Sequence, residues 1–189
     1  CGVLIRELDR SKRAIWGTKL HLTPRQLTKE VYRTGVASLA TVGKIKYEKI
    51  WLDLKNKFNL TGRDINQIEQ DFHAGDQLNT EFYTFMHDVH KKYKTALLSN
   101  AWLNAREIYT RKYHLDKVVD EMIISAEEGL RKPDKTIFQV ALNRLGVSAE
   151  EVIYVDDRAD NIRTAKALGM HTVLFTDTKE AIEEIESFL

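Results

Sequence analysis

The chain has 189 residues, of which 43% are hydrophobic and 30% are charged, as in an ordinary globular protein. Its formal net charge of +1 gives no global reason to expect nucleic acid or an anionic membrane as a partner. No apolar run approaches the ~20 residues that a membrane span needs, and the only cysteine, Cys1, excludes an intrachain disulfide, so we expect a reducing, cytoplasmic location.

The chain begins with "CGVLIREL" and not with Met. This stretch lacks the basic and then apolar build of a signal peptide. It is typical of the second half of a β-strand and its exit. We therefore expect a fragment that lacks its first residues, and with them most of its first strand.

Helix signals fill the stretch from Asp9 to Lys92. Thr23 followed by Pro24 is a strong helix start, because threonine caps the first turn and proline is tolerated at its first position. We expect residues 9–92 to be helices only, inserted between the first strand and the second. Within this insert we expect Trp51 and Tyr83 to be packing residues and not ligand contacts.

From Lys94 onward the pattern alternates between short apolar runs and segments of helical periodicity. The predicted strands are Lys94–Asn100, Asp120–Ser125, Val152–Asp156 and His171–Phe175. The predicted helices are Leu103–Leu115, Lys135–Gly146, Arg158–Gly169 and a last one capped by Asp177 or Thr178. Repeated strand–helix units predict an α/β fold with a Rossmann-like parallel sheet covered on both faces. Residues 1–8 and 93–189 would form this core, and residues 9–92 an inserted helical unit.

Two adjacent carboxylates, Asp156 and Asp157, end a predicted buried strand. Such a pair is costly without a compensating cation. Mg²⁺ resolves the cost, since its sites use one or two carboxylates together with water and phosphate oxygens. Asn161, in the first turn of the following helix, would orient the metal ligands. The alternative is a helix cap, which needs one acid and not two.

Two further features lie at the carboxyl ends of predicted strands, where ligands of parallel sheets bind. Ser99 and Asn100 offer a hydroxyl and a backbone N–H that suit a phosphate oxygen, although the same pair is common in plain turns. Lys132 precedes Pro133, which holds it in an extended loop. Its alternative interpretation is a solvent-exposed lysine in a turn.

The ordered set "CGVL", "ALLSN", "GLRKPD", "VIYVDDRADN" and "ALGM" resembles the haloacid dehalogenase-like (HAD) hydrolase superfamily over nearly the whole chain. "TVGKIKYEKIW" resembles the helical cap of the first subgroup of that family. The resemblance implies a core with a helical cap that closes over it. It also implies a Mg²⁺-dependent phosphomonoesterase that acts on a small phosphorylated metabolite through an aspartyl-phosphate intermediate.

The resemblance assigns roles to individual residues. Ser99 and Asn100 would hold phosphoryl oxygens, and Lys132 would be a catalytic residue that neutralises the charge at the reacting centre. The metal ligands would be Asp157, Asp156 and the backbone carbonyl of Cys1, with Asn161 in support. The nucleophilic Asp would lie two residues before Cys1, outside this sequence, so we expect the fragment itself to be inactive.

Cys1 stands where efficient phosphatases of the family carry an acid–base Asp, and a thiol is a poorer proton donor to a leaving alcohol at neutral pH. A thiol nucleophile at Cys1 is disfavoured because no partnered His is evident. The alternatives are a 2-haloacid dehalogenase on the same fold, a non-catalytic relative that binds a phosphorylated ligand or a partner, and a mutase. The double Asp disfavours the dehalogenase, and the cysteine disfavours the mutase.

Overall fold

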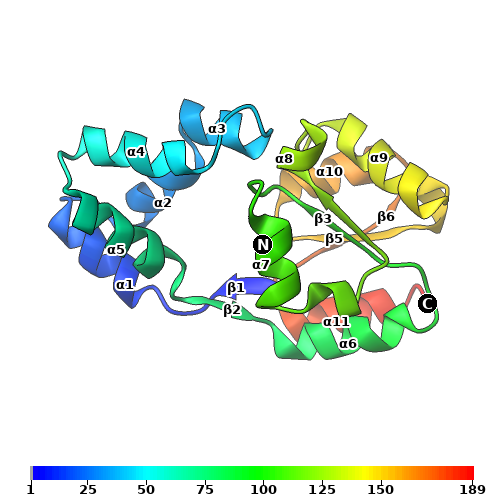
Figure 1. Ribbon diagram of the computed structural model, residues 1–189. Helices are drawn as coiled ribbons and strands as arrows, with labels where there is room; N and C mark the ends of the chain where they lie inside the picture. The colour runs from blue at the N-terminus through cyan, green and yellow to red at the C-terminus, as the bar shows by residue number, and fades with distance from the viewer. Residues whose placement is uncertain (1) are drawn as a thin grey trace.

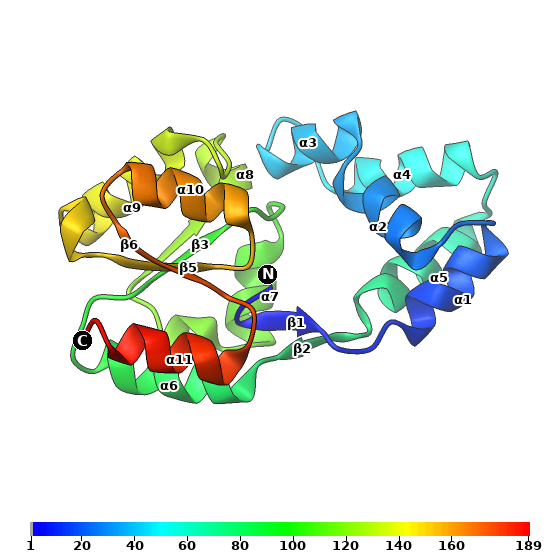
Figure 2. The same ribbon diagram turned by 180° about the vertical axis from the view of Figure 1, so that it is seen from behind.

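The computed structural model describes residues 2–189 and shows two lobes joined by a narrow connection (Figures 1 and 2). One lobe contains only helices, and we call residues 11–73 the helical lobe. The other contains the parallel strands with helices on both sides, and we call it the α/β lobe. No helix of residues 2–189 is long and apolar enough to cross a membrane.

The helical lobe consists of α1 (Ser11–Lys19), α2 (Pro24–Tyr32), α3 (Gly35–Thr41), α4 (Glu48–Lys57) and α5 (Gly62–His73). The expected start at Thr23 is confirmed, since its side chain and that of Gln26 form a capping box. One apolar cluster unites the five helices, with Leu27 and Ile68 fully buried in it. Trp51 is 3% exposed within this cluster, so it packs as expected.

The α/β lobe has three layers. Its strands are β3 (Ala96–Ser99), β4 (Glu121–Ile124), β5 (Ile153–Asp156) and β6 (His171–Leu174). Its helices are α6 (Thr80–His90), α7 (Ala105–Arg111), α8 (Ser125–Glu128), α9 (Lys135–Leu145), α10 (Ala159–Ala167) and α11 (Thr178–Glu186), with short 3₁₀ turns at Leu115–Lys117 and Ala149–Glu151. Helices α8, α9 and α10 lie on one side of the strands, and α6 and α11 lie on the other (Figures 1 and 2). The predicted α/β fold with a Rossmann-like core is confirmed.

The parallel strands form two separate pairs, β3 with β4 and β5 with β6. Within residues 2–189 no strand is hydrogen-bonded between β3 and β5. Strands inside a covered parallel sheet are normally buried. Because no strand is hydrogen-bonded between β3 and β5 in the described residues, their side chains are only half-buried at Ala96–Leu98 and Ile153–Val155. The absence of most of a first strand stays a prediction.

The expectation that residues 9–92 are helices only is wrong at one point. Residues Asp76–Leu78 form a strand, β2, which pairs antiparallel with β1 (Ile5–Glu7). β1 belongs to this two-stranded ribbon and not to a parallel pair, so it is a different strand from the one expected to end before Gly2, which lies outside the described residues. Three residues are too few to give a readable alternation, so only the pairing reveals β2.

Helix α6 was expected in the helical insert, but it packs against the α/β lobe. Phe82 on α6 is 3% exposed and lies in an apolar cluster with Val173 and Phe175. Its ring meets that of Phe175 edge-on at 5.6 Å. The domain boundary at residue 92 stays a prediction, and this packing favours an earlier end of the helical unit.

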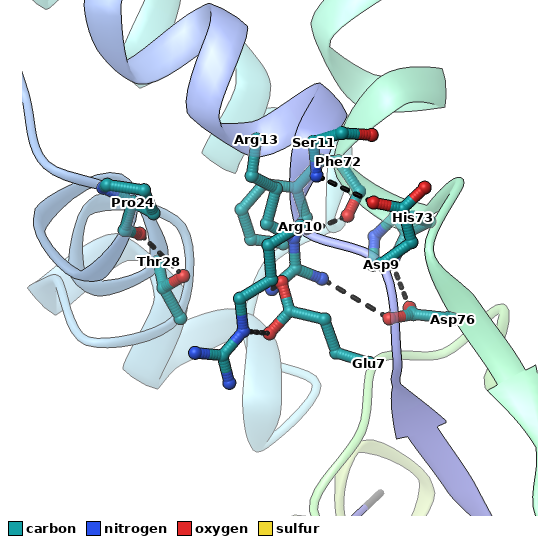
Figure 3. Close-up of polar contacts among 10 residues, drawn as sticks. All are labelled: Glu7, Asp9, Arg10, Ser11, Arg13, Pro24, Thr28, Phe72, His73 and Asp76. Carbon is teal, nitrogen blue, oxygen red and sulfur yellow. Dashed lines mark hydrogen bonds and ion pairs between the residues drawn. The ribbon is translucent and has the colours of Figure 1, made fainter.

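A buried arginine holds the connection between the lobes (Figure 3). The Arg13 side chain, 5% exposed, donates from Nε to Phe72 O at 2.6 Å and stands 3.9 Å from the centre of the Phe72 ring. Its other nitrogens lie 2.6 Å from Glu7 Oε1 on β1 and 3.3 Å from Asp76 Oδ1 on β2. Arg13 therefore fixes the first and last helices of the lobe to both strands of the ribbon.

Candidate active site

The carboxyl ends of β3 and β5 meet around one lysine. Lys132, in the loop between α8 and α9, places its ammonium 2.7 Å from the backbone oxygen of Leu98 on β3. The same nitrogen lies 2.7 Å from Oδ2 of Asp156, the last residue of β5. The Lys132 side chain is 10% exposed, so the interpretation as a solvent-exposed turn lysine is wrong.

Asp156 is surrounded by four donors and is 4% exposed. Oδ2 accepts from Lys132 Nζ and from the Tyr154 hydroxyl at 2.6 Å. Oδ1 accepts from the Arg158 backbone N–H and from Asn161 Nδ2, both at 2.9 Å. Burial alone would raise the pKa of Asp156, but the Lys132 charge and the hydrogen bonds outweigh burial and hold that pKa below its ordinary value.

The depressed pKa of Asp156 predicts a loss of stability in acid. Because the ionised form is favoured in the folded state, Asp156 stabilises the fold above its unfolded pKa of about 4, and this contribution disappears as the pH falls through the lower folded value. The free energy of unfolding of the wild type should therefore exceed that of Asp156→Asn at pH 6, and the gap should narrow below about pH 4. Urea unfolding across this range measures it. Asp53→Asn, at an exposed position of α4, should show no such narrowing gap.

Both oxygens of Asp156 are occupied by hydrogen bonds, so the candidate metal-binding oxygens are those of Asp157 and Asn161. Asp157 is exposed and has no hydrogen-bond or ion-pair partner within residues 2–189. Asn161 is 2% exposed, and its Oδ1 is buried without a partner among the same residues. A carboxylate and an amide oxygen are hard donors that fit Mg²⁺, which keeps several of its own waters. Residues 2–189 contain no cluster of three His, Cys, Asp or Glu side chains that would hold a metal alone.

The start of the chain lies directly over Asp157. Gly2 has a φ of +130°, and a Cβ placed on it would stand 2.3 Å from Asp157 Oδ2. Only glycine allows the backbone to pass this close to the carboxylate. The proposed carbonyl ligand at Cys1 lies outside the described residues.

Ser99 and Asn100 lie at the same strand end, but their side chains face other partners. Ser99 is 2% exposed, and its hydroxyl lies 3.0 Å from the hydroxyl of Tyr109 on α7. Burial raises the pKa of Tyr109 to about 12, so this phenol stays protonated. If the phenol donates to Ser99 Oγ, the serine proton is free for another acceptor.

The Asn100 side chain holds the backbone of the lysine loop. Asn100 Nδ2 donates to Lys132 O, and Asn100 Oδ1 accepts from Lys132 N–H, both at 2.8 Å. This pair of bonds fixes the main chain from which the Lys132 ammonium extends. Direct hydrogen bonds therefore connect Asn100, Lys132, Asp156 and Asn161, and Ser99 is the residue before Asn100 in the chain.

Sequence reasoning missed Tyr154, which donates to Asp156 and packs edge-on against Phe138 at 5.2 Å. Burial and the nearby Asp156 carboxylate raise the pKa of Tyr154, so it acts as a permanent donor. The signal was present in the sequence, because residues two apart on a strand face the same side. Tyr109 had no such signal, since its contact with Ser99 depends on how α7 packs.

A family model covers most of the chain. The model of a haloacid dehalogenase-like hydrolase matches residues 12–169. The mouse protein acyl-CoA dehydrogenase family member 10 is 37% identical over 101 residues, which are 52% of this chain and 9% of that protein. Glyceraldehyde 3-phosphate phosphatase of Methanocaldococcus jannaschii is 51% identical over 55 residues, 29% of this chain and 24% of that protein. The chain spans less than a third of the length of the curated relatives that it matches first.

A solved structure shows the same fold. A HAD family enzyme of Bacteroides thetaiotaomicron, in complex with magnesium and inorganic phosphate, superimposes with a TM-score of 0.74 and 20% sequence identity. The likeness covers 92% of this chain and 89% of that one. It therefore includes both lobes.

Proposed function

The chain belongs to the haloacid dehalogenase-like hydrolases, and we propose on that premise that its parent protein is a Mg²⁺-dependent phosphomonoesterase acting on a small phosphorylated metabolite. One observation carries the proposal. The Lys132 ammonium, from the loop between α8 and α9, is fixed between the ends of β3 and β5. It lies beside the segment that carries Asp157 and the Asn161 oxygen, which has no partner within residues 2–189. A fixed cation beside free hard oxygens suits a phosphoryl group with its metal ion.

Each residue has a defined part in this reaction. The nucleophile would be the Asp two positions before Cys1, forming an aspartyl-phosphate that water then hydrolyses. Lys132 would neutralise charge on the nucleophile and the phosphoryl oxygens. Ser99 and the Asn100 backbone N–H would donate to those oxygens, and the Tyr109 bond would keep the serine proton directed away from α7.

Asp157, with Asn161 in support, would hold Mg²⁺, which when bound supplies further positive charge at the phosphoryl oxygens. Asp156 contributes indirectly, because its oxygens are already occupied by four donors. Its part would be to fix Lys132 and Asn161. We therefore rank Asp157 as the ligand and Asp156 as the residue that positions its neighbours.

The relatives support phosphate-ester chemistry. One matching protein is a glyceraldehyde 3-phosphate phosphatase and another is the sesquiterpene phosphatase astK of Aspergillus oryzae. The solved neighbour contains magnesium and inorganic phosphate. On the single cysteine we also assign the protein to the cytoplasm, with small phosphorylated molecules as its partners.

The deciding experiment uses the full-length parent protein with p-nitrophenyl phosphate and 2-chloropropionate, each with Mg²⁺ or with EDTA. We expect phosphate release that needs Mg²⁺, no halide release, and no turnover by the isolated 189-residue chain. Slow turnover would fit Cys1 in place of an acid–base Asp. Metal-independent halide release would identify a dehalogenase, and inactivity on both substrates, with binding of phosphate retained, would identify a non-catalytic relative.

A further inference from the structure

The loop after β3, residues 100–102, is held at each residue by a different part of the molecule. Asn100 is bonded to the backbone of Lys132, as described above. The Ala101 N–H donates to Ser125 Oγ at 3.0 Å. Trp102, 9% exposed, belongs to the apolar cluster of the helical lobe and stacks on Tyr47 with ring centres 5.9 Å apart. This loop therefore lies between the lysine of the candidate site and the helical lobe.

Ser125 connects the two sides. It is the first residue of α8 and is fully buried. Its Oγ lies 2.7 Å from the backbone oxygen of Thr41, at the end of α3, and 3.1 Å from the backbone oxygen of Ala101. A hydroxyl has one proton and can donate fully to one acceptor at a time. The shorter distance assigns that proton to Thr41 while the helical lobe is docked, and withdrawal of the lobe would transfer it to Ala101.

The docking contact beside Thr41 is backbone against backbone. Gly43 has a φ of +68°, and a Cβ placed on it would stand 2.1 Å from the backbone oxygen of Ala126. No side chain at position 43 fits while the lobe touches α8. The backbone at Gly43 and the backbone at Ala126 are thus in close contact, next to the Ser125 hydroxyl.

We propose that Ser125 is a positioning residue that couples docking of the helical lobe to the conformation of the 100–102 loop, and through Asn100 to Lys132. With the lobe docked, Ser125 donates to Thr41 and accepts from Ala101, while Trp102 is held by the lobe. With the lobe withdrawn, all these restraints on the loop change together. The coupling itself is independent of the reaction. Its consequence, that phosphate binding and lobe docking favour each other, rests on the proposed function.

Amide hydrogen exchange on the 189-residue chain tests the coupling without any turnover. Ser125→Ala removes the shared hydroxyl, and Gly43→Ala displaces the lobe while the hydroxyl stays. Ser125→Ala should speed exchange of the Ala101 amide by about tenfold, the effect of one lost buried hydrogen bond. Gly43→Ala should also speed it, because displacement of the lobe releases Trp102 although the Ala101 amide keeps Ser125 Oγ as its acceptor. Two controls match Gly43→Ala. Gly146→Ala has the same left-handed backbone, with φ +62° and no atom nearer than 3.9 Å, and Gly35→Ala lies in α3 with open space around it. Neither control should change Ala101 exchange.

Each outcome decides the proposal. If Gly43→Ala speeds exchange in the turn at residues 42–45 but leaves the Ala101 amide as protected as in Gly146→Ala, the coupling is absent. Should both variants unfold, the wild type in urea below its unfolding transition gives the answer. The Ala101 and Gly43 amides must then open with the same dependence on urea, and independent opening overturns the proposal.

A second arm tests the consequence on the full-length parent protein, with inorganic phosphate and Mg²⁺ as the probe. Phosphate at saturation should slow exchange at Gly43 in the wild type and not in Ser125→Ala. If phosphate binds yet leaves Gly43 exchange unchanged, the link to the site is wrong. If phosphate does not bind while Ala101 and Gly43 still open together, the proposed function fails and the coupling stands.

Discussion

Replacing Arg13 by methionine is expected to lower the free energy of unfolding by about 3–5 kcal/mol, as removal of one partner from a buried ionic network does. Methionine keeps the apolar stem but leaves Glu7 and Asp76 facing each other across the β1–β2 ribbon, where they are directly paired. Their side chains are each 20% exposed, so solvent screens this repulsion only in part. The variant also loses the bond to Phe72 O and the contact with the Phe72 ring.

The matched control is Arg10→Met. Arg10 lies three residues earlier and contacts the same Glu7, but its side chain is 71% exposed (Figure 3). An exposed pair contributes about 0–1 kcal/mol, so this variant should be close to the wild type. Urea unfolding followed by circular dichroism measures both. Equal effects of the two substitutions would show that burial of Arg13 does not stabilise the connection.

Lys132→Met is expected to reduce kcat of the parent protein on p-nitrophenyl phosphate by about 100- to 1,000-fold, the range for loss of one fixed electrostatic group. Methionine fills the space but leaves Leu98 O without its donor and Asp156 without a cation. The buried carboxylate would then lose about 3 kcal/mol of stabilisation, which urea unfolding of the 189-residue chain detects separately.

Lys135→Met serves as the control, since Lys135 is exposed at the start of α9, three residues after Lys132. It removes the same charge from the same region without touching β3 or β5. Its kcat and its free energy of unfolding should match the wild type. A Lys132 variant that loses stability yet keeps its full kcat would restrict this lysine to a structural role.

Strands β3 to β6 and helices α7, α9, α10 and α11 were predictable from their apolar periodicity and, for some of them, from a local signal at one end, whereas the short helix α8 was not. Gly146, for example, adopts a left-handed conformation after α9, which glycine tolerates without steric cost. Asp177 caps α11 with its side chain, as one of the two expected residues. The lobe to which α6 belongs was not predictable, because an amphipathic pattern shows that a helix buries one face but not against which partner.

The sequence by itself determined the α/β fold, the helical lobe and the order of Ser99, Lys132 and the Asp156–Asp157 pair, since these depend on residue type and spacing along the chain. Only the tertiary structure showed that the two carboxylates have different surroundings. Asp156 is the last residue of β5 and Asp157 lies in the bend that follows, so their side chains have different neighbours. Lys132, 24 residues earlier, reaches Asp156 and binds it, while Asp157 lies beside Gly2 and has no hydrogen-bond or ion-pair partner within residues 2–189. In the double Asp, Asp156 thus fixes the lysine, and Asp157 is the carboxylate that we propose as the metal ligand.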